Sequence, residues 1–234
     1  MADVEIIELG GVKIPLDPEV LSPAIIKSLR LGRYENSRVK TLLGMIDPGE
    51  RIVDVGSGMG FIPAFMALPG KAALIVGVDG HPALQAYADR LYRLNGVEVT
   101  SRNALVVTRK TTATERLYLS NDFWGSSMIP DVKDQTGVAE VATVSFGELI
   151  ADYQPTMLTI DLEVMREYLR PDAASGPLEA MELAGVEKVL AHIPMHLAGQ
   201  RGIKRVFDFF SAQDFYYNID HSRGGVVLFS RIQS

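Results

Sequence analysis

The segment Val53-Asp54-Val55-Gly56-Ser57-Gly58-Met59-Gly60 decides the fold of this chain. It begins in an apolar run and ends, after three glycines, in front of a helical pattern, so it predicts a buried strand, a tight turn and a helix. Glycine has no Cβ atom, so the backbone of such a turn can come close to a ligand. The segment is therefore typical of the turn that opens a nucleotide-type α/β fold.

Short apolar strands alternate with helices after this turn. Strands are predicted at 72–78, 97–103, 157–160 and 186–191, and helices at 64–68, 83–94, 146–151, from about 178, and at 201–211. Strands without polar alternation fit a sheet that is covered on both faces. We therefore predict an α/β fold with a Rossmann-like, doubly wound, mostly parallel sheet, in which residues 215–219 and 226–229 form a C-terminal antiparallel strand pair.

Two further segments are predicted around this core, and residues 1–234 together are predicted to form a single domain. Residues 1–49 are expected to be a helical N-terminal preface, because apolar side chains over 23–46 are spaced for one helix face. The core is expected over 50–234, with an inserted strand pair at about 111–145. The loop of this insertion carries Trp124 and Met128, which either cover a bound acceptor or pack onto the strands.

The charge and composition of the chain limit its partners. Its net charge is −6, and an acidic protein is a poor candidate for coating phosphate backbones, so no nucleic-acid partner is predicted. The absence of cysteine excludes disulfides and thiolate metal sites. No apolar run is long enough for a membrane span, and the acidic N-terminus does not resemble a secretory signal, so a cytoplasmic location is expected. The sequence does not indicate an oligomeric state.

Two acidic residues at predicted strand ends indicate the cofactor. An ionised Asp54, two positions before Gly56, would repel a pyrophosphate but suits a cationic ligand, although it could instead cap the turn. Asp79 closes the next strand and could accept hydrogen bonds from both hydroxyls of a ribose, or lie in a surface loop. S-adenosylmethionine carries a sulfonium and an ammonium and no phosphate, so this charge pattern predicts it as the cofactor.

Phe61 distinguishes this turn from a dinucleotide site, because it stands where the G-x-G-x-x-G pattern requires its third glycine. Asn103 and Ala104 follow the third strand and could meet the adenine edge, and Glu35 of the preface could reach over the cofactor. The complete predicted cofactor site consists of Glu35, Asp54, Gly56, Ser57, Gly58, Gly60, Asp79, Gly80, Asn103, Ala104 and Asp161.

A hydroxyl that accepts a methyl group must also lose its proton, so a general base is expected. Asp161 and Glu163 follow the strand at 157–160, where open α/β sheets place their sites, and each could instead cap the next segment or pair with an arginine. His192 and His196 follow the next strand, and an imidazole is a natural base near neutral pH. The predicted catalytic residues are Asp161, Glu163 and His192. No spacing of acids and histidines indicates a metal site, so no metal is predicted, although Asp161 with a neighbouring acid could hold a Mg²⁺ ion.

A series of short motifs, in order along the chain, resembles the FkbM family of S-adenosylmethionine-dependent methyltransferases. These motifs are Asp17-Pro18-Glu19, Gly32-Arg33-Tyr34-Glu35, the segment from Asp54 to Gly60, Asn95-Gly96-Val97, Asn103-Ala104, Gly125-Ser126-Ser127 and Thr159-Ile160-Asp161-Leu162-Glu163. The resemblance implies a fold of the class I methyltransferase type. It also implies O-methyl transfer to a hydroxyl of a small natural product, sugar or glycan-like acceptor.

Two positions depart from the pattern of that family. Val164 stands where the family usually has glycine, and His192 follows an alanine where the family commonly has an acidic residue followed closely by histidine. These departures leave open a relative that binds S-adenosylmethionine without transferring its methyl group. The shared fold also leaves open a nicotinamide-dependent oxidoreductase, against which Asp54 and Phe61 argue.

Overall fold

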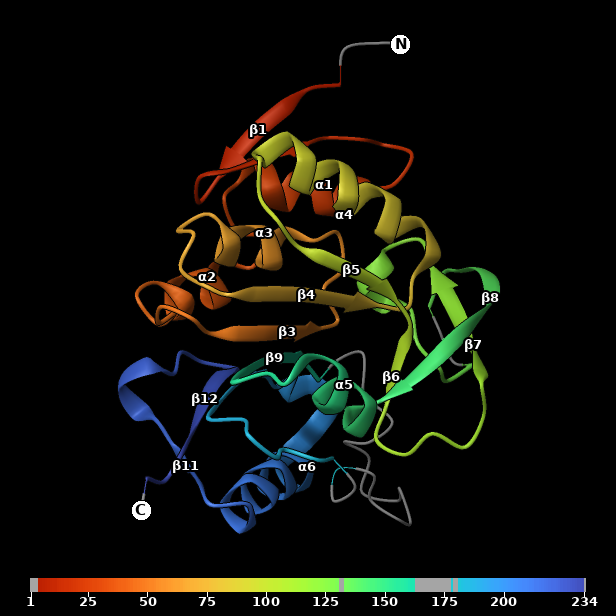
Figure 1. Cartoon of the computed structure of the whole chain (residues 1–234). Coiled ribbons are helices and arrows are strands. Elements are labelled where there is room, and N and C mark those ends of the chain that lie inside the picture. The colour runs from red at the N-terminus through yellow and green to blue at the C-terminus, as the bar shows by residue number, and fades with distance from the viewer. Residues whose placement is uncertain (1–3, 131–132, 163–177, 179–180, 234) are drawn as a thin grey trace.

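The computed structural model describes residues 4–130, 133–162, 178 and 181–233. Its centre is a seven-stranded sheet in the order β11-β12-β10-β9-β3-β4-β5 (Figure 1). Five strands are parallel to one another: β3 (Arg51–Val55), β4 (Leu74–Asp79), β5 (Thr100–Asn103), β9 (Met157–Asp161) and β10 (Lys188–His192). The strand β12 (Val226–Arg231) is antiparallel to both of its neighbours, β10 and β11 (Phe215–Tyr217). The predicted Rossmann-like sheet with its closing antiparallel pair, the class I methyltransferase type, is confirmed.

Both faces of the sheet are covered, because successive side chains of a strand point to opposite faces and most of them are apolar in β3 and β4. Ile52 and Ile75 pack on one side with helices α1 (Pro23–Arg30), α2 (Asn36–Leu42), α3 (Phe61–Ala67) and α4 (Pro82–Asn95). Val53 and Val76 pack on the other side with α5 (Phe146–Tyr153) and α6 (Met195–Ala212). Figure 1 shows the first group at the top of the view and the second group below.

The sequence predicts a helical N-terminal preface, but the preface also contains a pair of strands. An antiparallel hairpin of β1 (Ile6–Leu9) and β2 (Val12–Pro15) precedes the helices, and it buries alternate apolar side chains of β2 against the core. The helical stretch is also divided in two, because Gly32 and Glu35 have left-handed backbones, with φ of 63° and 52°.

The inserted strand pair is present and contains an additional strand. The predicted pair is β7 (Thr114–Ser120) with β8 (Gln135–Ser145), which are antiparallel, and β6 (Leu105–Val107) joins β8 in a parallel pairing that the sequence did not predict. The short 3-10 helix η1 (Phe123–Gly125) follows β7. In Figure 1 this small sheet extends beyond the ends of β3 and β4, on the right of the view.

The predicted helix from about residue 178 is wrong over residues 181–187, although Leu178 itself lies in a 3-10 helical turn. Residues 181–187 contain no helix, because Gly185 has a left-handed backbone and the carbonyls of Leu183 and Val186 accept hydrogen bonds from the Arg231 guanidinium. A short 3-10 helix, η4 (Ile219–His221), precedes β12. No helix within the described ranges is long and apolar enough to cross a membrane.

The third glycine of the turn serves packing. Gly60 has a φ of 84°, and a Cβ atom there would lie 2.6 Å from the Tyr92 hydroxyl oxygen and 2.8 Å from the Cβ of Ala88. Both neighbours belong to α4, so this helix packs directly against the bare backbone of the turn.

We expect Gly60→Ala to lower the free energy of unfolding by about 2–5 kcal/mol, because a left-handed alanine costs about 1–2 kcal/mol and overpacking adds about 1–3 kcal/mol. The control is Gly70→Ala, since Gly70 is also left-handed, with a φ of 63°, but has nothing within 4 Å of an added Cβ. Urea unfolding measures both variants. Equal losses would contradict the packing role of Gly60.

Candidate functional site

A cavity of about 910 Å³, counting its open mouth, lies at the carboxyl ends of β3, β4 and β9. Its walls come from the glycine turn, the ends of β4 and β9, strand β6, the residues around the start of α2, and η1. Open α/β sheets bind their ligands at this edge. The cavity is therefore the candidate site, and it is enclosed by the preface and the insertion as well as by the sheet.

The backbone N–H groups of the glycine turn are largely used inside the protein. Gly56 and Ser57 both donate to the carbonyl of Val78, at 2.9 and 3.1 Å, and Gly58 donates to Asp79 Oδ2 at 2.8 Å. A pyrophosphate site needs such N–H groups to face the ligand. The turn therefore supplies close backbone approach but few donors for a phosphate.

Asp79 is fixed by two backbone donors at the end of β4. In addition to the bond from Gly58, its Oδ1 accepts from the His81 N–H at 2.8 Å. Burial raises the pKa of Asp79 to about 6, although the two N–H donors act against this rise. Each carboxylate oxygen has a second lone pair, so Asp79 can still accept two hydroxyl hydrogen bonds from a ligand in the cavity.

A buried guanidinium, Arg38 of α2, organises the opposite end of the cavity. Its Nη2 lies 2.8 Å from Asp54 Oδ1, and its Nη1 lies 3.6 Å from Glu35 Oε2 and 4.0 Å from Asp161 Oδ2. Burial acts against the charge of Arg38, but these three carboxylates raise its pKa further above the ordinary value. The sequence alone does not predict Arg38 as part of the site. Its only signal was a cation within the apolar helix pattern of 23–46.

Asp54 lies behind the cavity wall. Its side chain is fully buried, and its Oδ1 accepts hydrogen bonds from both Arg38 and the Thr159 hydroxyl. Asp54 is not among the residues that line the cavity. The structure therefore places the predicted cofactor acid where it holds Arg38, which does line the cavity.

Asp161 and His192 are brought together, although the sequence predicted them as separate candidates. They end β9 and β10 and face each other in the register of these parallel strands, with His192 Nδ1 3.1 Å from Asp161 Oδ1. Burial lowers the pKa of His192, but the hydrogen bond and charge of Asp161 outweigh this effect and raise it overall. Asp161 lines the cavity, and His192 lies beside it with a third of its side chain exposed. Glu163 lies outside the described residues.

The remaining predicted cofactor residues divide into two groups. The residues that line the cavity are Glu35, Gly56, Ser57, Gly58, Asp79, Gly80, Ala104 and Asp161. Gly60 and Asn103 do not line it: Gly60 faces α4, and Asn103 Nδ2 donates to the carbonyl of Asp79 at 2.9 Å. Within the described ranges, no group of three or more His, Asp or Glu side chains is arranged to hold a metal ion.

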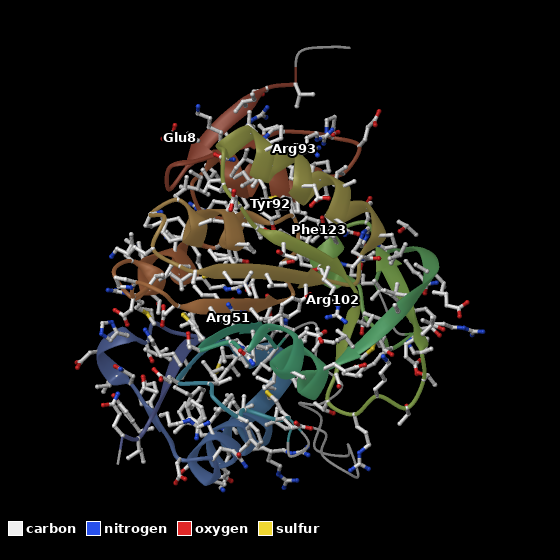
Figure 2. All side chains as sticks on the ribbon, in the orientation of Figure 1. Glu8, Arg51, Tyr92, Arg93, Arg102 and Phe123 are labelled. Carbon is white, nitrogen blue, oxygen red and sulfur yellow. The ribbon has the colours of Figure 1, made fainter. Side chains whose placement is uncertain are left out.

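Aromatic side chains of the insertion reach the preface across the mouth of the cavity. The rings of Trp124 and Tyr34 are stacked, with centroids 6.4 Å apart and planes inclined by 22°. Phe123, labelled in Figure 2, lies so close to Gly58 that a Cβ there would be 3.2 Å from its ring. Trp124 and Met128 both line the cavity, and Met128 also packs on the inserted strands. Met128 therefore fits both predictions for this loop, because it faces the cavity, where an acceptor could bind, and also packs onto the strands.

Comparison with known proteins finds distant structural likeness only. No protein-family model and no curated protein matches the chain, so membership of the FkbM family stays a prediction. Among solved structures, a tRNA (uracil-54, C5)-methyltransferase of Pyrococcus abyssi in complex with S-adenosyl-L-homocysteine is 15% identical with a TM-score of 0.48, over 97% of this chain and 43% of that one.

Two bacterial structures are similar over more of their own length. Streptococcus pneumoniae Sp1610 in complex with S-adenosyl-L-methionine is 12% identical with a TM-score of 0.45, over 84% of this chain and 73% of that one. The ribosomal protein L11 methylase of Lactobacillus delbrueckii subsp. bulgaricus is 10% identical with a TM-score of 0.43, over 83% and 74%. These likenesses are distant and assign no function to this chain.

We expect Arg38→Met to lower the free energy of unfolding by about 3–5 kcal/mol at pH 8, because it leaves buried carboxylates without their cation. The loss should be smaller at pH 5.5. Burial already raises the pKa of Asp54, so its carboxyl can take up a proton as the pH falls and relieve the unpaired charge.

The control for this experiment is Arg30→Met, which breaks an exposed ion pair with Glu5 and should cost at most about 1 kcal/mol. Urea unfolding at both pH values measures the two variants. A loss for Arg38→Met no larger than for the control would contradict the role assigned to Arg38.

Proposed function

We propose that this chain is an S-adenosylmethionine-dependent methyltransferase. The observation that carries the proposal is one cavity in which Glu35, Asp79 and Asp161 face the ligand while the N–H groups of the glycine turn point into the protein. Such a cavity suits a nucleoside with cationic groups and no phosphate. The pyrophosphate of a nicotinamide dinucleotide would meet backbone N–H groups that already donate hydrogen bonds within the protein. It would also meet carboxylates that repel it.

The lining residues have chemistry that matches the parts of this cofactor. Asp79 would accept hydrogen bonds from the ribose hydroxyls, and Ala104 and Leu105 offer an apolar wall for the adenine ring. Arg38 would face the carboxylate of the methionine part, and Asp161 would face its ammonium. When bound, the cofactor supplies a methyl group on a sulfonium that a nucleophile displaces in line.

We further propose that the acceptor is a hydroxyl of a small natural product, sugar or glycan-like molecule, and that His192 is the general base. Asp161 accepts a hydrogen bond from His192 Nδ1–H, which leaves Nε2 with the lone pair that takes the hydroxyl proton. The raised pKa of His192 strengthens it as a base. The acidic lining of the cavity favours such an acceptor over a nucleic acid, whose phosphates it would repel. We also propose that the protein is cytoplasmic.

Binding of S-adenosylhomocysteine tests the cofactor assignment. We expect Asp79→Asn to weaken it at least tenfold at pH 7.5, because hydrogen bonds to a charged acceptor contribute about 1.5–3 kcal/mol. Wild-type affinity should also fall as the pH drops below about 6, where Asp79 takes up a proton, by up to about tenfold per pH unit. The asparagine variant should lose this pH dependence.

Isothermal titration calorimetry from pH 5 to 8 measures these affinities, with Asp152→Asn as the control because Asp152 is exposed and pairs with Arg102 away from the cavity. Binding of NAD in place of S-adenosylhomocysteine would refute the methyltransferase proposal in favour of an oxidoreductase.

Catalysis is tested by Asp161→Asn and His192→Gln. We expect each to lower the rate of methyl transfer to hydroxylated acceptors by about 10²–10⁴-fold, as loss of a general base does. The affinity for S-adenosylhomocysteine should fall by a smaller factor than the rate in Asp161→Asn, and by less than about threefold in His192→Gln. His196→Gln is the control, since His196 is exposed and does not end a strand beside Asp161.

A titration by NMR gives a readout that does not need the acceptor. The chain has four histidines, and the pKa of His192 should lie above its ordinary value in the wild type and fall in Asp161→Asn. An unchanged His192 pKa in Asp161→Asn would remove the basis for the pair. Intact cofactor binding without transfer to any acceptor would instead favour a non-catalytic relative.

A further inference from the structure

The cavity holds more negative charge than the cofactor neutralises. Its charged lining side chains are the carboxylates of Glu35, Asp79 and Asp161 and the guanidinium of Arg38, so two net negative charges face it when all are ionised. S-adenosylmethionine has one net positive charge, and S-adenosylhomocysteine has none. At least one uncompensated negative charge therefore remains in a site that a second ligand would close, and excluding water makes such a charge costly.

This excess charge is concentrated at the acceptor end of the cavity. Asp79 ends β4 and Asp161 ends β9, with β3 between them, so about two strand spacings, ~10 Å, separate them. Under the proposed function the ribose engages Asp79. Glu35 and Asp161 instead lie together around Arg38, at 3.6 and 4.0 Å, and His192 is bonded to Asp161 at this same end.

The backbone of Glu35 supports a functional role for its carboxylate. Its φ of 52° is left-handed, which costs a residue with a Cβ atom about 1–2 kcal/mol, and such strain persists mainly at functional sites. Trp124 lies at the mouth of the same cavity with 40% of its surface exposed. The face of an indole ring attracts cations. A carboxylate and an indole lining one cavity are a pair of groups suited to an ammonium.

We propose that the acceptor is a hydroxylated amine of the amino-sugar class, whose ammonium is recognised by Glu35 and Trp124 while its hydroxyl faces His192. This inference rests on the proposed function and specifies its substrate. The positive charge of such an acceptor would neutralise the complex with S-adenosylmethionine. A phosphate-bearing acceptor would add to the excess negative charge and should be excluded.

Three sugars of the same skeleton test this proposal on the full chain saturated with S-adenosylhomocysteine, at about pH 7. They are glucosamine, which is cationic, glucose, which is neutral, and glucose 6-phosphate, which is anionic. Trp124 is the only tryptophan of the chain, so its fluorescence reports binding at the mouth of the cavity. Glucosamine should bind at least about tenfold more tightly than glucose, and glucose 6-phosphate more weakly than glucose.

The matched variants are Glu35→Gln and Glu8→Gln. The first keeps the shape and the left-handed backbone but removes the charge, so glucosamine should bind within about threefold of glucose. Glu8 is an exposed residue of β1, and Figure 2 shows it far from Phe123 of η1, so the second variant should keep the preference.

Three results would overturn the proposal while S-adenosylhomocysteine still binds. The first is binding of glucose 6-phosphate that is as tight as that of glucose or tighter. The second is no binding of any of the three sugars. The third is a preference for glucosamine over glucose that is unchanged in Glu35→Gln. Failure of S-adenosylhomocysteine to bind in the first step would contradict the proposed function itself, so the two failures are distinguishable.

Discussion

The ion pairs of the buried Arg38 are the interactions on which the site depends. This one guanidinium joins α2 of the preface to Asp54 of β3 and to Asp161 of β9, and so ties the preface to two neighbouring strands of the central sheet. Burying a charge without partners is costly, so the preface helix must stay where these carboxylates surround Arg38. The same contacts fix the orientation of Asp161, which in turn bonds to His192. Stability and site geometry therefore share a single cluster of charges.

The two ends of the cavity differ in how their carboxylates are held. Asp79 is fixed by backbone N–H donors and has a pKa raised to about 6 by burial, which suits hydrogen bonding to neutral hydroxyls. Glu35 and Asp161 are fixed by a side-chain cation and leave negative charge toward the ligand. One end of the cavity thus suits the neutral hydroxyls of a ligand, and the other end is acidic. A ligand with a nucleoside at one side and a positive charge at the other matches both ends.

The parts that the sequence predicted correctly depend on local patterns. Apolar strands and a glycine turn predicted the sheet, and their ends predicted Asp79 and Asp161 at its carboxyl edge. A glycine pattern does not distinguish approach of a ligand from packing of a helix, so Gly60 was assigned to the cofactor although it faces α4. Arg38 was missed because a charged residue in a helix is expected at the surface, and only contacts across the fold explain its burial.

The walls of the cavity also determine what a shortened form of this chain could do. Tyr34 stacks on Trp124, and the Ser22 hydroxyl donates to Asp122 just before η1, so the first forty residues contact the insertion directly. A fragment that starts at β3 would keep every strand of the central sheet. It would lack Arg38 and one wall of the site. The preface is therefore a structural component of the candidate site, and the segment that encloses the cavity is longer than the sheet that defines the fold.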